Sequence, residues 1–192
     1  MSVSKKYISA QQLLDDSFNI GLQILNSGFI PNYIVGVWRG GTPVGIAVQE
    51  LLDYFGIHTD HIAIRTSLYT GIEKRATKVK VHGLSYIVKN ANAKDSVLIV
   101  DDVYDTGLSV KQVVDDLHAE CRLNTPTIKI ATPYFKPSNN KTDKEPDYYL
   151  HSTDEWLVFP HELSGLTMQE ILDNKPGIDS LREKLKQRLA SE

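Results

Sequence analysis

Three acidic residues stand where an apolar segment of the chain ends. Asp101 and Asp102 directly follow the apolar run 97–100, and Asp105 comes three positions later. Neighbouring carboxylates at the edge of a core repel each other and lose hydration, so they need partners that favour their charge. Vicinal hydroxyl groups, which donate hydrogen bonds, or a divalent cation would serve. The acids therefore indicate a site for a polyhydroxyl ligand, a cation, or both.

The residues after the acid pair have the composition of an anion-binding turn. Segment 105–109 reads Asp-Thr-Gly-Leu-Ser, and helical periodicity begins at Ser109. A turn from a strand into a helix exposes unpaired backbone N–H groups, and the helix dipole favours negative charge there. Gly107 permits close approach, while Thr106 and Ser109 add hydroxyl groups. A phosphate cradle beside hydroxyl-binding acids describes a site for ribose 5-phosphate.

The elements that must position these residues alternate along the chain. Short apolar runs predict strands at 33–38, 61–66, 97–101, 127–135, 148–152 and 155–159. Helical spacing predicts helices at 10–27, 43–55, 83–91, 109–121, 166–173 and 178–190. This alternation implies an α/β fold with a parallel sheet covered on both faces. Ligands of such sheets bind beyond the carboxyl ends of the strands, which gathers segments 39–43, 67–82, 101–109 and 135–139 on one rim.

Composition fits an ordinary globular domain. The chain has 192 residues, a net charge of −3 and 41% hydrophobic residues, so nucleic acid is not an expected partner. The single cysteine, Cys121, excludes an internal disulfide and fits a reducing compartment. No apolar run suits a membrane span, and the N-terminus lacks the apolar core of a secretory signal. These features predict a cytoplasmic protein with no membrane partner.

The run 97–109, Val-Leu-Ile-Val-Asp-Asp-Val-Tyr-Asp-Thr-Gly-Leu-Ser, resembles the phosphoribosyl-pyrophosphate signature of the type I phosphoribosyltransferases. The alternative is a strand that ends in a solvated acidic turn before a capped helix. The resemblance implies a three-layer α/β fold: a central, mostly parallel sheet flanked by helices, plus a small hood and C-terminal helices. It implies a single domain over 1–192, with a core at about 9–135 and the hood and helical tail at about 136–192.

The resemblance also implies roles within this signature. The phosphoribosyl-binding residues would be Asp101, Asp102, Asp105, Thr106, Gly107, Leu108 and Ser109. Asp101 and Asp102 would contact the ribose hydroxyls and Mg²⁺, and the segment from Asp105 to Ser109 would hold the 5-phosphate. Asp105 would lie near N7 of a purine and act as general acid/base, which requires its carboxylate to reach the proton of a ring nitrogen.

The segment 35–43 resembles the pyrophosphate loop of the same family. The resemblance implies that Arg39 and Gly40 bind pyrophosphate and makes Trp38–Arg39 the candidate for a cis peptide bond. Amides freed by the glycines can point at an anion, and the guanidinium adds a bidentate donor. Considered alone, the segment is equally compatible with a glycine turn before a helix.

The stretch 65–75 resembles the long flexible loop that closes over the reaction centre in this family. Ser67 and Tyr69 match its Ser-Tyr core, with Leu68 as an extra residue relative to some members. Closure has a chemical reason, because water would intercept an oxocarbenium-like transition state. The alternative is a solvated basic loop.

Two further stretches resemble the branch of the family that acts on 6-oxopurines. The resemblance implies that Lys136 donates to the exocyclic O6, a contact that adenine with its amino group would not accept. Trp156 would stack on the purine and the Leu157 backbone would read the ring edge, while Glu162 is a further candidate metal ligand. Considered alone, the lysine could be solvent-facing and the tryptophan part of the core.

Together these stretches predict a purine salvage enzyme, a glycosyltransferase of the pentosyltransferase class. It would transfer ribose 5-phosphate from phosphoribosyl pyrophosphate to N9 of hypoxanthine, guanine or xanthine, giving the nucleoside monophosphate and pyrophosphate with Mg²⁺ as cofactor. A homodimer or homotetramer is expected from the resemblance. The alternatives are a regulatory phosphoribosyl-pyrophosphate-binding protein on the same fold and a transferase for another base.

Overall fold

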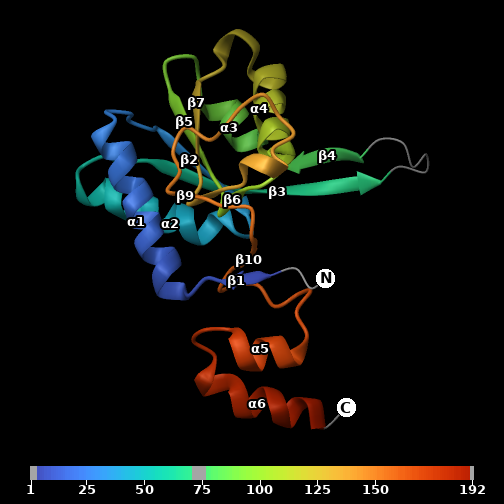
Figure 1. Cartoon of the computed structure of the whole chain (residues 1–192). Helices are drawn as coiled ribbons and strands as arrows, with labels where there is room; N and C mark the ends of the chain where they lie inside the picture. The colour runs from blue at the N-terminus through green and yellow to red at the C-terminus, as the bar shows by residue number, and fades with distance from the viewer. Residues whose placement is uncertain (1–3, 71–76, 191–192) are drawn as a thin grey trace. The chain divides into compact units, whose positions relative to one another are not determined.

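The computed structural model describes residues 4–70 and 77–190, and the chain divides into two compact units (Figure 1). The larger unit comprises Asp16–Asp154. The smaller unit combines the segment up to Asp15 with the segment from Glu155 onward. Among the described residues, no helix is both long and apolar enough to cross a membrane.

The element bounds follow the predicted alternation closely. The strands are β1 Lys5–Tyr7, β2 Tyr33–Trp38, β3 Asp60–Thr70, β4 Thr77–His82, β5 Ser96–Val100, β6 Val103–Tyr104, β7 Thr127–Ala131, β8 Tyr134–Phe135, β9 His151–Ser152 and β10 Trp156–Val158. The α-helices are α1 Ala10–Asn26, α2 Gly41–Tyr54, α3 Ser85–Asn90, α4 Leu108–Cys121, α5 Met168–Asn174 and α6 Asp179–Ala190. Short 3₁₀ turns follow α4 and β8, at Arg122–Asn124 and Pro137–Asn139.

A five-stranded sheet in the order β4-β3-β2-β5-β7 forms the centre of the larger unit. Its strands are parallel except β4, which pairs antiparallel with β3. Helices α1 and α2 lie on one face and α3 and α4 on the other (Figure 1). Because both faces are covered, the interior strands are continuously apolar: residues 34–37 and 97–100 are all buried.

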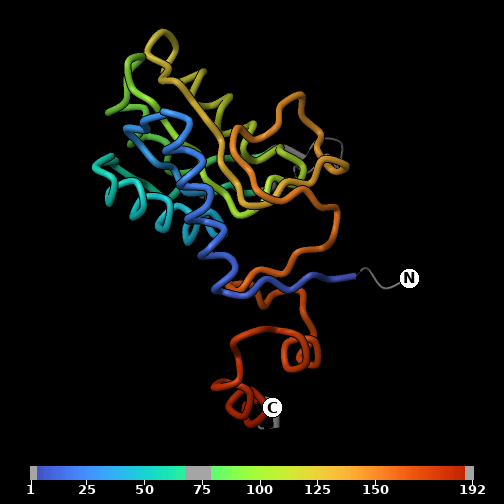
Figure 2. The backbone as a smooth tube through the Cα atoms, turned by 60° about the vertical axis from the view of Figure 1, so that its left-hand side comes forward, coloured from blue at the N-terminus to red at the C-terminus, as the bar shows by residue number. Residues whose placement is uncertain are grey.

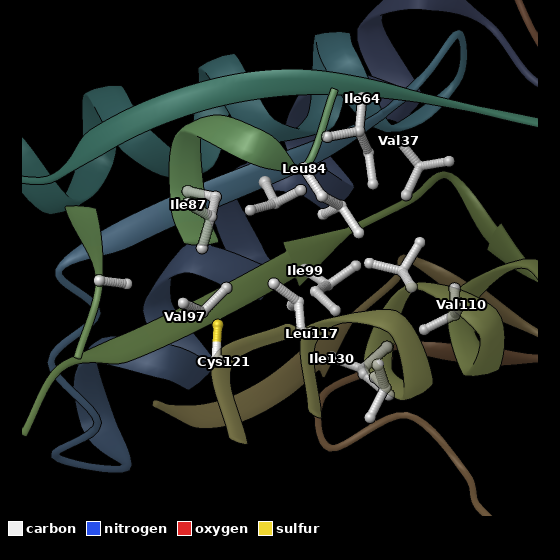
Figure 3. Close-up of a cluster of buried hydrophobic side chains, with 14 of the residues drawn as sticks. Val37, Ile64, Leu84, Ile87, Val97, Ile99, Val110, Leu117, Cys121 and Ile130 are labelled. Atoms are coloured by element: carbon white, nitrogen blue, oxygen red, sulfur yellow. The ribbon is translucent and has the colours of Figure 1, made fainter. Parts of the chain in front are cut away.

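The main apolar core lies between the sheet and the face formed by α3 and α4 (Figure 3). Figure 3 labels ten of its residues: Val37, Ile64, Leu84, Ile87, Val97, Ile99, Val110, Leu117, Cys121 and Ile130. Val97 and Ile99 alternate along β5, as the two-residue period of a strand requires, and face Leu117 of α4. Cys121 is a buried free thiol, so it packs as a small apolar residue.

The segment predicted as one strand at 127–135 is two strands in different sheets, so that prediction was wrong in extent. Strand β7 ends at Ala131, and β8 belongs to a three-stranded parallel sheet, β6-β8-β9. Pro133 lies between them and has no N–H to give to a ladder. The chain therefore leaves the central sheet at the rim where the site was expected.

No strand was predicted within 67–82, and this too was wrong for most of its length. Residues 67–70 belong to β3 and residues 77–82 form β4, in register from Arg65↔His82 to Thr70↔Thr77. In β4 lysines alternate with Val79 and Val81, a strand pattern hidden by the basic composition. The rest of the predicted loop, 71–76, lies outside the described residues.

In the smaller unit, β1 and β10 form a two-stranded parallel sheet, followed by α5 and α6 (Figure 2). Lys5 pairs with Trp156 and Tyr7 with Val158, and the N–H of Ile8 donates to the Val158 carbonyl over 2.9 Å. Strand β1 was not predicted because three residues give no periodicity.

Candidate active site

The predicted phosphate loop is a tight turn between β5 and α4. Gly107 caps α4 with φ of 73°, a left-handed conformation that side chains rarely adopt. A Cβ here would lie 2.6 Å from the Tyr104 ring, so both the backbone and the packing require glycine. Beside the turn is a pocket of about 90 Å³. Its lining residues are Asp101, Val103, Tyr104, Asp105, Thr106, Gly107, Ser109 and Val110.

The acid pair carries the electrostatic strain expected of adjacent carboxylates. Desolvation, and then the neighbouring Asp102 charge, raise the pKa of Asp101 well above its usual value. Backbone N–H groups of Asp102, at 3.0 Å, and of Gly41 donate to the Asp101 carboxylate and partly oppose this rise. Hydroxyl donors or a cation would relieve the remaining penalty. The two acids therefore fit a Mg²⁺ ion shared with a sugar, as carboxylate oxygens suit this cation.

The predicted pyrophosphate loop lies directly against the acid pair. A Cβ on Gly40 would be 1.9 Å from Asp102 Oδ2, and one on Gly41 would be 2.1 Å from the Val100 carbonyl oxygen. Gly40 caps α2, so its neighbouring amides stand at a helix N-terminus. The Trp38–Arg39 peptide bond is cis, at the position proposed from the sequence. Arg39 is exposed.

Asp105 and Lys136, 31 residues apart in the chain, meet at this rim. Lys136 follows β8 and is buried, and its Nζ donates to Asp105 Oδ2 over 3.3 Å. Asn139 Nδ2 donates to the other oxygen, Oδ1, over 3.0 Å. Each oxygen of the proposed acid/base group therefore has its own donor. A buried lysine is rare without such a partner.

The segment after Lys136 is tied to the phosphate loop by more than this contact. The backbone N–H of Lys141 donates to the Thr106 carbonyl over 3.0 Å. The Tyr104 hydroxyl lies 3.0 Å from the Thr142 hydroxyl, either of which can donate. Tyr104, Asn139 and Thr142 were not among the predicted site residues. Asn139 and Thr142 lie in a polar segment without periodicity, and Tyr104 belongs to a strand of only two residues, β6.

The remaining candidates of the larger unit lie on β3. Ser67 Oγ is 3.3 Å from His82 Nε2, across the ladder between β3 and β4. The backbone of Leu68 pairs with Val79 and that of Tyr69 with Lys78. Loop closure by these residues stays a prediction.

The other candidates belong to the smaller unit. Trp156 is 57% exposed on β10, whereas Leu157 is buried. The Glu162 carboxylate accepts a hydrogen bond from the Phe159 N–H at 3.0 Å, a structural contact. Within 4–70 and 77–190, no three His, Cys, Asp or Glu side chains gather as a metal site. The metal role of Glu162 stays a prediction.

Comparison with known proteins identifies the family of this chain. Residues 9–169 match the phosphoribosyl transferase domain. The chain belongs to this family. Its fold is accordingly the mixed α/β type I phosphoribosyltransferase fold predicted from the sequence, with a parallel-rich sheet flanked by helices.

Several solved structures resemble this chain over most of its length. A purine phosphoribosyltransferase from Pyrococcus horikoshii is 30% identical, with 85% of this chain and 97% of that chain covered and a TM-score of 0.67. A xanthine-guanine-hypoxanthine phosphoribosyltransferase from Helicobacter pylori is 22% identical over 81% of this chain and 92% of its own, with a TM-score of 0.66. A Neisseria gonorrhoeae protein with bound ppGpp is 17% identical over 86% and 93%, with a TM-score of 0.71. The last two share the fold.

Proposed function

We propose that this protein is a 6-oxopurine phosphoribosyltransferase of purine salvage. It transfers ribose 5-phosphate from phosphoribosyl pyrophosphate to N9 of hypoxanthine, guanine or xanthine. The observation that carries the proposal is the 3.3 Å contact between Asp105 and Lys136. It joins the acid of the phosphate-loop signature to a buried donor, at the rim where a base attached to the ribose would lie.

In the proposed reaction, N9 of the base bonds to C1′ of the ribose while the bond from C1′ to the pyrophosphate oxygen breaks. The amides and hydroxyls of 106–109 hold the 5-phosphate, and Asp101 and Asp102 accept hydrogen bonds from the ribose hydroxyls. The leaving pyrophosphate takes both bonding electrons and lies against Arg39 and the amide at Gly40. Positioning of the two substrates supplies much of the rate increase.

Asp105 handles the proton of the base. Its carboxylate accepts the proton that the ring loses as N9 forms the new bond, so no charge accumulates on the purine. In the structure both oxygens already hold donors, Lys136 and Asn139. When a base binds, Lys136 turns from Asp105 to the O6 of the ring. That exchange frees Oδ2 for the proton, while Asn139 keeps the carboxylate oriented.

Mg²⁺, when bound, would neutralise charge on the leaving pyrophosphate. Asp101 and Asp102 are the residues that would hold it.

Lys136 also sets the preference among bases. An ammonium group only donates hydrogen bonds, so it matches the O6 acceptor of hypoxanthine, guanine or xanthine. The 6-amino group of adenine would bring a donor against a donor, and the hydrogen bond that an O6 acceptor makes with Lys136 would be lost, at a cost of about 1–3 kcal/mol.

Pyrophosphate release tests the function directly. The purified protein is supplied with phosphoribosyl pyrophosphate, Mg²⁺ and, in parallel reactions, hypoxanthine, guanine, xanthine, adenine or orotate. We expect release with at least one 6-oxopurine and little with adenine. Release only with adenine or orotate would indicate a transferase for another base. Calorimetric binding of phosphoribosyl pyrophosphate without any turnover would support the regulatory binding protein instead.

The homodimer or homotetramer expected from the resemblance stays a prediction, to be measured by size-exclusion chromatography with light scattering.

A further inference from the structure

The C-terminal segment 170–188 lies beyond the stretch that matches the family, yet three of its residues are buried. These are Ile171, Lys175 and Ile178. Two apolar side chains are ordinary anchors for a helical extension, but a lysine that is only 5% exposed is not. Its position calls for a physical explanation.

The ammonium group of Lys175 binds the backbone at the end of β10. Its Nζ donates to the Phe159 carbonyl oxygen over 2.8 Å. Burial lowers the pKa of Lys175, and the Glu162 carboxylate opposes that change. A buried ammonium costs free energy, and an apolar side chain of similar volume is often neutral or stabilising in its place. The lysine is therefore a poor choice for stability alone.

Glu162 binds the other backbone polar group of Phe159, its N–H. Its Oε2 accepts a hydrogen bond from the Phe159 N–H at 3.0 Å. Both backbone polar groups of Phe159 are thus bound by charged side chains, and its ring is buried. Phe159 directly follows β10, whose residues include Trp156 and Leu157. The end of this strand is fixed from both directions.

A second charged contact reaches the partner strand. Glu170, in α5, accepts a hydrogen bond from Lys5 Nζ over 2.5 Å. Lys5 lies on β1 and pairs in register with Trp156 of β10. The Lys5 ammonium and the Thr167 amide lower the pKa of Glu170 to about 2, so the carboxylate is charged throughout the neutral range. The extension therefore holds one strand of the two-stranded sheet through Glu170 and the other through Lys175.

We propose that Lys175 and Glu170 are positioning residues through which the C-terminal extension fixes β10 for base binding. This inference rests on the proposed function and on the sequence-based prediction that Trp156 and the Leu157 backbone contact the purine. Neither Lys175 nor Glu170 need touch the substrate, because each acts on the strand that does. A strand end held at both its N–H and its C=O presents its neighbours in one geometry, which reduces the ordering cost of binding.

The effect of Lys175 on the end of β10 is tested without any assay of activity. Hydrogen–deuterium exchange is compared between the wild type and Lys175→Met, which keeps the aliphatic stem and removes the donor. Amide exchange at residues 156–159 should accelerate by about tenfold, the factor expected for loss of about 1.4 kcal/mol of local hydrogen bonding. Exchange in α2 should not change. Unchanged exchange at 156–159 would overturn the proposal.

Glu170→Gln provides a second variant at a more accessible position. Glutamine preserves the capping box with Thr167 and removes the charge that binds Lys5. We expect faster exchange in 5–7 and 156–158. Lys186→Met is the matched control, because Lys186 pairs with Glu183 on the exposed surface of α6. It should leave exchange in both strands unchanged.

The proposal predicts that Lys175→Met affects the binding of the two substrates differently. In Lys175→Met, KM or Kd for the purine should rise by about tenfold, while KM for phosphoribosyl pyrophosphate and kcat change by less than about threefold. Equal losses for both substrates would indicate general unfolding and overturn the positioning role. So would faster exchange with unchanged purine affinity. If the wild type releases no pyrophosphate, the proposed function fails. The exchange data still show whether Lys175 and Glu170 fix β10.

Discussion

Gly40 lies in direct contact with the carboxylate of Asp102, so close that a methyl group at residue 40 would overlap its oxygen at 1.9 Å. The two residues belong to different loops, one leading into α2 and the other following β5. The contact brings the pyrophosphate loop and the acid pair into one site, because β2 and β5 are neighbours in the sheet.

Gly40→Ala should disrupt this junction. The added methyl group forces the loop or Asp102 to move, which we expect to destabilise the protein by about 1–3 kcal/mol and to raise KM for phosphoribosyl pyrophosphate. Gly45→Ala in α2, the helix that Gly40 caps, is the control, since its Cβ would meet Ile34 at an ordinary 3.7 Å. It should leave KM unchanged. Thermal melting and initial rates measure both; equal behaviour of the two variants would contradict the close contact.

Asp101→Asn should increase stability while weakening substrate binding. The pKa of Asp101 is raised in the folded protein, so its contribution to folding is fully present below its unfolded pKa and is lost as pH rises through the folded value. The variant should therefore exceed the wild type by about 1 kcal/mol at pH 7, with the difference vanishing toward pH 3. Urea unfolding at several pH values measures it. A variant less stable than the wild type at pH 7 would contradict the destabilising effect of the Asp101 charge.

Asp105→Asn should abolish most turnover and preserve binding. The amide cannot accept the proton of the base, so kcat should fall by about 100- to 10,000-fold. The Kd for phosphoribosyl pyrophosphate, measured by calorimetry, should change by less than about threefold. Unchanged kcat would remove Asp105 from the acid/base role.

Lys136→Ala should selectively impair the use of 6-oxopurines. Loss of the ammonium removes the donor to O6, and kcat/KM for hypoxanthine or guanine should fall by about 100-fold. Lys141→Ala is a matched control, because this exposed residue of the same loop contacts Thr106 through its backbone N–H. If phosphoribosyl pyrophosphate binding falls as much as base use, the lysine is structural.

Asn139→Ala should lower kcat by about tenfold with little effect on either KM, since it removes the donor that keeps Asp105 oriented. Asn139→Asp should be worse, because a second carboxylate would repel the first. Steady-state kinetics of the two variants provide the measurement. An aspartate variant as active as the alanine variant would show that the contact does not influence Asp105.

The apolar periodicity predicted most of the central elements. Strand β2 occupies 33–38 as expected, and α4 begins at Leu108, one residue before the expected start. Strand β2 is a continuous apolar run with both faces covered, and α4 buries apolar residues at helical spacing on the face that packs on the sheet. Strands β1 and β6 have three residues and two, and β4 is masked by lysines. Such elements are stabilised by partners distant in the chain, which local sequence does not contain.

The sequence by itself determined the chemistry of one loop: two acids, a third acid, a glycine and two hydroxyls at a helix start. Those residues are adjacent in the chain, so spacing alone brings them together. Only the tertiary structure decided that Gly40 abuts Asp102, that Lys136 and Asn139 hold Asp105, and that Lys175 binds Phe159. Each of these contacts joins residues from different elements. Their proximity follows from strand order and packing, which the pattern of a single segment cannot specify.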